Sequence, residues 1–231
     1  MKSNRRKTKD ERRRTAHSSF VIGHSSIPEA LNRAAQALAA TDNYPRLTAE
    51  VLLAHILGLA RTHLLARPEQ TVTSTALTKY ERLVERAADG EPLAYLDGHR
   101  EFYGLDFLVD SRVLVPRPET ELLIDLALRF TAELAENAEI AEKDSANSAN
   151  SALSAVNILD VGTGSGCIAV TLAVKLPSAR ITALDVSADA LVVASANAER
   201  HRVSDRIEYV QGDLLSDFIL HTSYFNLLCA N

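Results

Sequence analysis

The spacing of apolar residues divides the chain into a helical first part and a second part in which strands alternate with helices. Between residues 26 and 88, apolar positions recur every three to four residues and predict a small bundle of four helices. The first helix begins at Ser26-Ile-Pro-Glu29, where the serine and the glutamate have the spacing of a capping box. The other three are predicted at residues 48–57, from about Thr62, and at residues 74–88.

A β-hairpin and a long helix are predicted to follow the bundle. Residues 100–115 have the aromatic and β-branched content of a hairpin. Pro116 and Pro118 then stiffen the chain before a helix predicted over residues 119–134. Residues 135–155 are rich in Ala, Ser, Asn and Glu, which predicts a flexible surface loop or a frayed extension of the helix, and no function is assigned to them.

The last part of the chain has the pattern of an α/β domain. Short apolar runs alternate with helical patterns, as in a parallel, doubly wound sheet with right-handed crossovers. Ligands bind beyond the carboxyl ends of the strands in such a sheet. The strands are predicted at residues 157–161, 180–184, 206–211 and 225–230.

Composition indicates a soluble globular protein, with 46% hydrophobic and 24% charged residues among 231. No apolar run approaches the roughly 20 residues that span a bilayer. The net charge of −5 is uneven, because residues 1–14 hold eight Lys/Arg and two acids, whereas residues 15–231 hold 17 Lys/Arg and 28 Asp/Glu. The acidic body argues against a dedicated nucleic-acid surface. The basic tail is expected to be disordered and solvated, with contact to RNA or the ribosome as the alternative. Two cysteines and no metal cluster fit a reduced, cytoplasmic monomer.

A glycine-rich turn is the strongest candidate for a binding site. The strand predicted at residues 157–161 leads directly into Gly162, Gly164 and Gly166, and a helix follows at once. Glycine lets the backbone bend or a ligand come close, and a helix start offers free N–H groups. A dinucleotide fingerprint would need its third glycine at Cys167, which disfavours an NAD-linked enzyme. An ordinary turn without a ligand is the alternative. The residues predicted to bind a nucleotide-like cofactor here are Gly162, Thr163, Gly164, Ser165 and Gly166.

Two further strand ends carry polar residues that suit a nucleoside. Asp185 ends the second strand, where a carboxylate can accept both ribose hydroxyls; the alternative is a helix-capping aspartate ahead of Ser187. Asp213, after the third strand, is placed to accept a hydrogen bond from an adenine amino group, and Leu214 could offer a backbone N–H and an apolar wall. A plain turn aspartate is the alternative at 213.

Two stretches give the chain a family resemblance over about residues 27–231. They are Gly90-Glu-Pro-Leu-Ala-Tyr-Leu-Asp-Gly-His-Arg-Glu-Phe-Tyr-Gly104 continuing to Pro116-Arg-Pro-Glu-Thr-Glu121, and Ile158-Leu-Asp-Val-Gly-Thr-Gly-Ser-Gly166. With them, the chain resembles the release-factor glutamine methyltransferases, the HemK/PrmC family. The second stretch occurs in many S-adenosylmethionine-dependent methyltransferases, whereas the first is more specific.

The resemblance implies transfer of a methyl group from S-adenosylmethionine to the side-chain amide of a glutamine. That glutamine lies in the Gly-Gly-Gln motif of peptide-chain release factors. An amide nitrogen is a poor nucleophile, so the protein must position it and supply acceptors for its hydrogens. The family's Asn-Pro-Pro-Tyr motif maps onto Asn231 alone, which is assigned as the catalytic residue and as a contact of cofactor and substrate. Substrate contacts are also expected at Phe102, Arg117 and Glu119, with hairpin packing as the alternative for Phe102 and helix capping for Glu119.

The expected layout is a tail at 1–25, a helical substrate-docking domain at 26–98, a hairpin linker at 99–118 and a partial methyltransferase domain at 119–231. S-adenosylmethionine-dependent methyltransferases of the class that the chain resembles have a sheet of seven strands, and the sequence supplies four. We therefore expect a Rossmann-like sheet that is incomplete at its C-terminal end. A truncated chain of this kind is expected to be weak or inactive. Two alternatives stay open: a non-catalytic remnant that binds release factors, and an amino-methyltransferase acting on adenine in nucleic acid.

Overall fold

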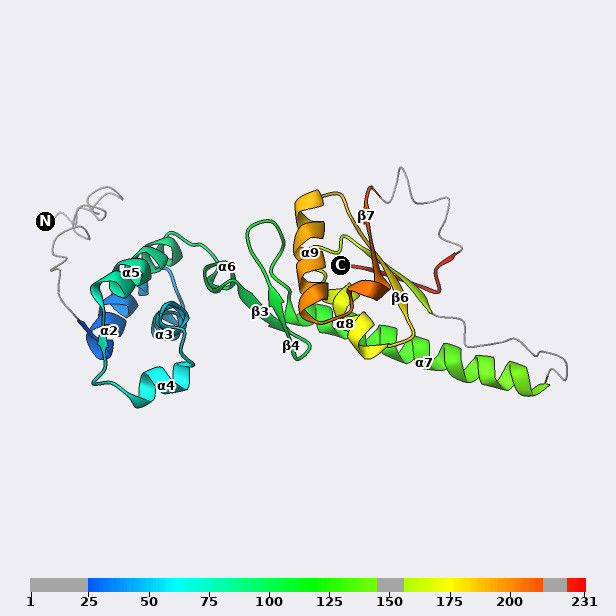
Figure 1. The fold of residues 1–231 in the computed structure, drawn as a ribbon, viewed down its shortest axis with the longest axis horizontal. Helices are drawn as coiled ribbons and strands as arrows, with labels where there is room; N and C mark the ends of the chain where they lie inside the picture. The colour runs from blue at the N-terminus through cyan, green and yellow to red at the C-terminus, as the bar shows by residue number, and fades with distance from the viewer. Residues whose placement is uncertain (1–24, 145–155, 214–223) are drawn as a thin grey trace, which may run out of the picture. The chain divides into compact units, whose positions relative to one another are not determined.

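The computed structural model describes residues 25–144, 156–213 and 224–231. The basic tail, most of the Ala/Ser/Asn-rich run and Leu214 lie outside the described residues. The chain divides between Glu91 and Pro92 into two compact units, which are described in turn (Figure 1). No helix in the described part of the chain is long and apolar enough to cross a membrane.

The first unit is the helical bundle predicted from the sequence. Glu29 accepts a hydrogen bond from the Ser26 backbone N–H at 3.0 Å, as expected at the start of a capped helix, and this bond lowers the pKa of Glu29. Tyr80 is buried among leucines of the bundle and donates its hydroxyl to the Ala49 carbonyl at 3.1 Å. The elements are β1 (Ser25–Ser26), α2 (Ile27–Leu38), α3 (Pro45–Leu57), α4 (Arg61–Ala66), β2 (Thr71–Val72) and α5 (Ser74–Ala88).

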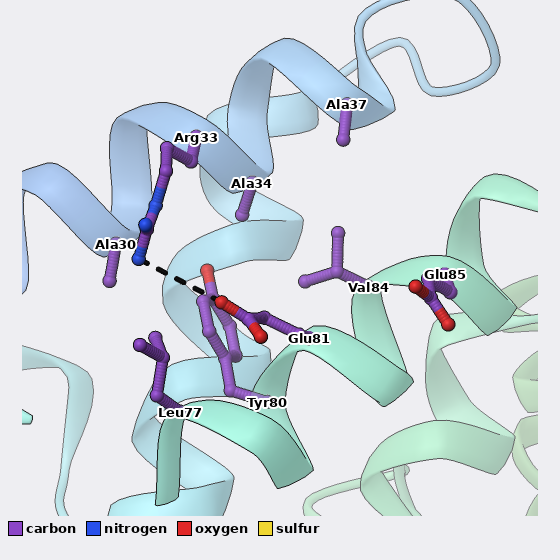
Figure 2. Close-up of a pocket in the computed structure, with 9 residues that line it drawn as sticks. All are labelled: Ala30, Arg33, Ala34, Ala37, Leu77, Tyr80, Glu81, Val84 and Glu85. Atoms are coloured by element: carbon purple, nitrogen blue, oxygen red, sulfur yellow. Dashed lines mark ion pairs between the residues drawn. The ribbon is translucent and has the colours of Figure 1, made fainter. Parts of the chain in front are cut away.

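A groove of about 130 Å³ lies between α2 and α5 (Figure 2). The side chains of Arg33 and Glu81 face one another across it, with 3.8 Å between a guanidinium nitrogen and a carboxylate oxygen. Burial raises the pKa of Glu81. The rest of the lining is mostly apolar: Ala30, Ala34, Ala37, Leu77, Tyr80, Val84 and the acidic Glu85.

The second unit is built on a four-stranded parallel sheet in the order β7-β6-β5-β8. The parallel sheet predicted from the sequence is confirmed, and so is a hairpin, although its strands lie within residues 99–108 and do not extend to 115. The elements are α6 (Leu93–Asp97), β3 (His99–Phe102), β4 (Leu105–Leu108), η1 (Pro118–Thr120), α7 (Glu121–Asp144), β5 (Asn157–Val161), α8 (Cys167–Lys175), β6 (Arg180–Asp185), α9 (Ala188–Arg200), η2 (Ser204–Arg206), β7 (Ile207–Gln211) and β8 (Leu227–Ala230).

The hairpin is fixed to the second unit by its tight turn. Tyr103 and Gly104 both have positive φ, 52° and 77°, the backbone that a two-residue hairpin turn of this hand requires. Tyr103 is held there by Glu121, which accepts its N–H at 2.9 Å, and by Asp125, which accepts its hydroxyl at 2.7 Å. Because both acids lie on α7, the turn fixes the hairpin against the start of that helix. Phe107 is buried in the same core as α8 and the sheet.

Candidate active site

The glycine-rich turn joins β5 to α8 and is held against the end of β6. The N–H groups of Gly162 and Thr163 both donate to the Leu184 carbonyl, at 2.8 and 3.0 Å. Gly162, Gly164 and Gly166 have φ of 69°, 55° and 77°, a region that favours glycine. The turn is therefore a fixed loop at the carboxyl edge of the sheet.

The outer glycines of this turn have different surroundings. A Cβ atom at Gly166 would lie 3.0 Å from the Cβ of Ala194 and 3.1 Å from its Cα, so helix α9 packs directly on this position. A Cβ at Gly162 would meet nothing within 4 Å. Gly166 is thus required for packing as well as for its backbone, while Gly162 leaves open space where a ligand could approach.

Asp160 lies at the end of β5 and is almost completely buried, with 1% of its surface exposed. One of its carboxylate oxygens accepts the Thr163 hydroxyl at 2.6 Å and the Ala169 N–H at 3.2 Å. Its other oxygen has no hydrogen-bond partner among the described residues. Burial raises the pKa of Asp160 from its ordinary 3.8 to about 6. This carboxylate therefore links the glycine turn to the first turn of α8.

The raised pKa of Asp160 predicts that the second unit loses stability as the pH rises. Between about pH 4 and 6 the folded unit keeps a proton that the unfolded chain releases, so the contribution is favourable below this range and lost above it. We expect the free energy of unfolding to fall by about 1 kcal/mol from pH 5 to pH 7 through this group. Urea titrations at both pH values, followed by circular dichroism, measure it. The Asp160→Asn variant should lack this component, and an identical pH dependence in both proteins would contradict the assignment.

Asp185 lies beside the glycine turn, at the end of β6. One carboxylate oxygen accepts the Gly164 N–H at 2.9 Å and the other accepts the Ser187 N–H at 2.9 Å. The second bond forms a turn ahead of α9, whereas the helix-capping role that the sequence leaves as an alternative belongs to Ser187, whose hydroxyl accepts the Ala190 N–H at 3.2 Å. Each carboxylate oxygen can accept more than one hydrogen bond, so the side chain keeps capacity for a pair of hydroxyl groups.

A small cleft of about 60 Å³ adjoins the glycine turn. Because β8 pairs with β5, Asn231 follows β8 at the same edge of the sheet, and its side-chain amino group donates to the Thr120 hydroxyl at 2.9 Å. Arg117 lines the cleft together with Leu114, Val115 and Pro116. The structure thus brings Asn231 and Arg117 together with residues 162–165 of the turn.

The other residues singled out from the sequence do not line this cleft. Phe102 is 1% exposed and packs edge-to-face on Phe107 with 6.1 Å between ring centroids, so hairpin packing accounts for its side chain. Glu119 is exposed on η1, and Asp213 is exposed after β7. Leu214 lies outside the described residues.

Asn197 of α9 is a buried polar residue that the sequence reasoning missed. Its carbonyl oxygen accepts the Leu108 N–H at 2.7 Å, and its amino group donates to the carbonyls of Leu108 and Ser165, each at 2.9 Å. It therefore ties hairpin strand β4 to the glycine turn. The available signal was a polar residue on the apolar face of the helix, one turn after Val193 and Ala194.

Comparison with known proteins assigns both parts of the chain. Residues 29–98 match the PrmC N-terminal domain, and residues 158–231 match a methyltransferase domain. A release factor glutamine methyltransferase from Chlorobaculum tepidum is 48% identical over 74% of this chain and 54% of its own length. A protein of the same name from Koribacter versatilis is 42% identical over 83% of this chain and 61% of its own length.

The chain thus carries a PrmC N-terminal domain followed by a methyltransferase domain, and it is similar to proteins named release factor glutamine methyltransferase. It spans between about half and two thirds of the length of these curated relatives. An RNA methyltransferase from Salinibacter ruber, solved in complex with S-adenosyl-L-homocysteine, is similar over 32% of this chain and 46% of its own, with 28% identity and a TM-score of 0.30. The methyltransferase domain supports S-adenosylmethionine as the cofactor expected from the sequence.

Proposed function

We propose that the protein transfers a methyl group from S-adenosylmethionine to the side-chain amide nitrogen of a glutamine in peptide-chain release factors. The observation that carries the proposal is the match to proteins named release factor glutamine methyltransferase, which extends over 74% and 83% of this chain and so covers both units. The glutamine of the Gly-Gly-Gln motif is the acceptor that the resemblance implies. Such a substrate requires a cytoplasmic protein.

The cofactor is proposed to bind at the carboxyl edge of the sheet. The turn at residues 162–166 would face its methionine part, and Asp185 would accept the ribose hydroxyls. Asp213 and Leu214 are proposed beside the adenine. When bound, the cofactor supplies a methyl group already activated by its sulfonium, so the remaining task of the protein is to hold the acceptor nitrogen in line.

Asn231 is proposed to hold the acceptor amide. Since its amino group already donates to Thr120, its carbonyl oxygen is left to accept a hydrogen from the substrate amide. An acceptor at this position orients the nitrogen and stabilises the positive charge that develops on it during attack. Arg117 and Glu119 are proposed to contact the substrate chain, and the helical first unit to dock the release factor.

A single-turnover assay tests this function. The 231-residue chain in excess over a release factor, with labelled S-adenosylmethionine, should place one methyl group on the Gly-Gly-Gln glutamine, located by peptide mass spectrometry. A release factor with that glutamine changed to alanine is the matched control and should stay unlabelled. Label on adenine of duplex DNA would instead favour the nucleic-acid enzyme, and tight binding of the release factor without any label would favour a non-catalytic binding protein.

A further inference from the structure

A second hollow, of about 480 Å³, adjoins the candidate active-site cleft within the second unit. The two share residues 114–117, so this short stretch of chain is a common wall between them. Besides that wall, the hollow is lined by α6 and by the first hairpin strand. The side chains used below are Leu93, Tyr95, Arg100, Leu114 and Arg117.

The charge of this hollow is entirely positive. Its two charged lining residues are Arg100 and Arg117, and no acid lines it. Residues 15–231 carry 28 acids and 17 Lys/Arg, so a hollow lined by basic residues alone is not expected from their overall composition. Within the described part of the chain, neither arginine forms an ion pair with a carboxylate, whereas nearby Arg112 is paired with Asp110 at 2.6 Å.

Arg100 carries an unsatisfied donor. Its Nε atom is buried and has no hydrogen-bond partner among the described residues. A buried charged donor without an acceptor is unfavourable, and such a group calls for an explanation. The terminal nitrogens of the same guanidinium are not among the buried atoms and form no hydrogen bond within the described residues, so an acceptor that arrives with the substrate could reach them.

We propose that this hollow binds a carboxylate of the substrate protein, an acidic side chain close in sequence to the methylated glutamine. A guanidinium presents its two terminal nitrogens as a planar fork that matches the two oxygens of a carboxylate. Arg117 adds a second positive charge, and Leu93, Tyr95 and Leu114 offer apolar contact to the stem of the acidic residue. That the carboxylate belongs to a release factor rests on the proposed function. That the ligand is a carboxylate rests on the hollow itself.

The shared wall sets the spacing of the acid from the glutamine. Four extended residues, as in 114–117, reach at most about 14 Å. A peptide with its glutamine in the cleft therefore reaches the hollow within about four of its own residues. This spacing can be tested by moving a single acid along a peptide.

The first arm of the test observes Arg100 directly and does not depend on methyl transfer. The Nε–H signals of the arginines are followed by nuclear magnetic resonance, with Arg100 and Arg117 assigned through the R100Q and R117Q variants. The blocked amino acid N-acetylglutamate amide should shift both signals and leave Arg112 unmoved, while N-acetylglutamine amide shifts neither. A shift with inorganic phosphate but not with the carboxylate would overturn the proposal and indicate a nucleic-acid phosphate instead.

The second arm uses short Gly-Gly-Gln peptides in which one glutamate is moved one to four residues to either side. With S-adenosylhomocysteine present, one placement should bind the chain about tenfold more tightly than the all-amide peptide, as one charge-assisted pair provides. The preference should vanish in R100Q/R117Q and fall in the exposed single variant R117Q, which does not threaten folding. The R112Q control should keep this preference and should leave the cofactor affinity unchanged.

The two arms separate the possible failures. Methylation of release factor without any acid preference or Arg100 shift would overturn the carboxylate hollow and leave the proposed function intact. An Arg100 shift with carboxylate, together with no methylation of release factor, would overturn the proposed function and leave the hollow as a carboxylate site. A preference that persists in R100Q/R117Q would overturn the assignment to these two arginines.

Discussion

Replacing Asp185 with alanine is expected to weaken S-adenosylmethionine binding at least about 100-fold. The proposed pair of ribose hydroxyls would lose a charged acceptor, and charge-assisted hydrogen bonds contribute about 1.5–3 kcal/mol each, with tenfold in affinity for each 1.4 kcal/mol. The same side chain accepts the Gly164 N–H at 2.9 Å, so its removal also releases the centre of the glycine turn. One substitution therefore removes a ligand contact and a support of the loop that faces the ligand.

Calorimetric titration with S-adenosylmethionine and with S-adenosylhomocysteine measures this loss. Asp189→Ala is the matched control, because Asp189 is an exposed acid in the first turn of the next helix and should leave the affinity unchanged. Asp185→Asn keeps one oxygen acceptor and should lie between the two. Equal affinity in Asp185→Ala and Asp189→Ala would show that Asp185 acts only in the turn ahead of α9, through its bond to the Ser187 N–H.

Replacing Asn197 with alanine is expected to destabilise the second unit by on the order of 3 kcal/mol. Three backbone groups lose their partner: the N–H and the carbonyl of Leu108, and the carbonyl of Ser165. Each buried group left unsatisfied costs about 1–3 kcal/mol, offset where water enters the space. Because these groups belong to both the hairpin and the glycine turn, the two segments should loosen together.

Hydrogen exchange read by mass spectrometry tests this coupling. Peptides from the hairpin and from the glycine turn should both exchange about 100-fold faster in Asn197→Ala. Arg206→Met is the matched control, because Arg206 donates to the carbonyls of Ala173 and Leu176, at 2.6 and 3.1 Å, at the far end of α8. Faster exchange at one segment only would contradict the idea that Asn197 joins them.

The sequence was most informative where the chemistry requires a particular residue in a particular backbone. Alternating glycines after an apolar strand predicted the turn at residues 162–166, and the structure gives all three glycines positive φ. The period of apolar residues predicted the four helices of the first unit and the four parallel strands of the second. These helices and strands can be predicted from local patterns alone, because each element packs its apolar side on a core.

What the sequence missed depends on contacts between distant residues. For residues 135–155 the sequence leaves a loop or a helix extension open, and α7 continues to Asp144, since an Ala- and Glu-rich stretch has high helix propensity even with little to bury. Asn197 and Leu108 are 89 residues apart, so no local sequence pattern predicts the hydrogen bonds between them. Arg100 was not singled out, because its buried Nε and its nearness to Arg117 exist only in the folded chain.

The contact between Gly166 and Ala194 has an evolutionary consequence. Since a Cβ at 166 would lie 3.0 Å from that of Ala194, enlarging either residue requires α8 and α9 to move apart. The two positions are therefore not free to drift independently, and relatives should keep a glycine at the first and a very small residue at the second. Gly162 has open space around it, so its positive φ, and not a neighbouring atom, ties that position to glycine. One end of the same short turn is thus tied to a partner residue on another helix, while the other end is constrained by its own backbone alone.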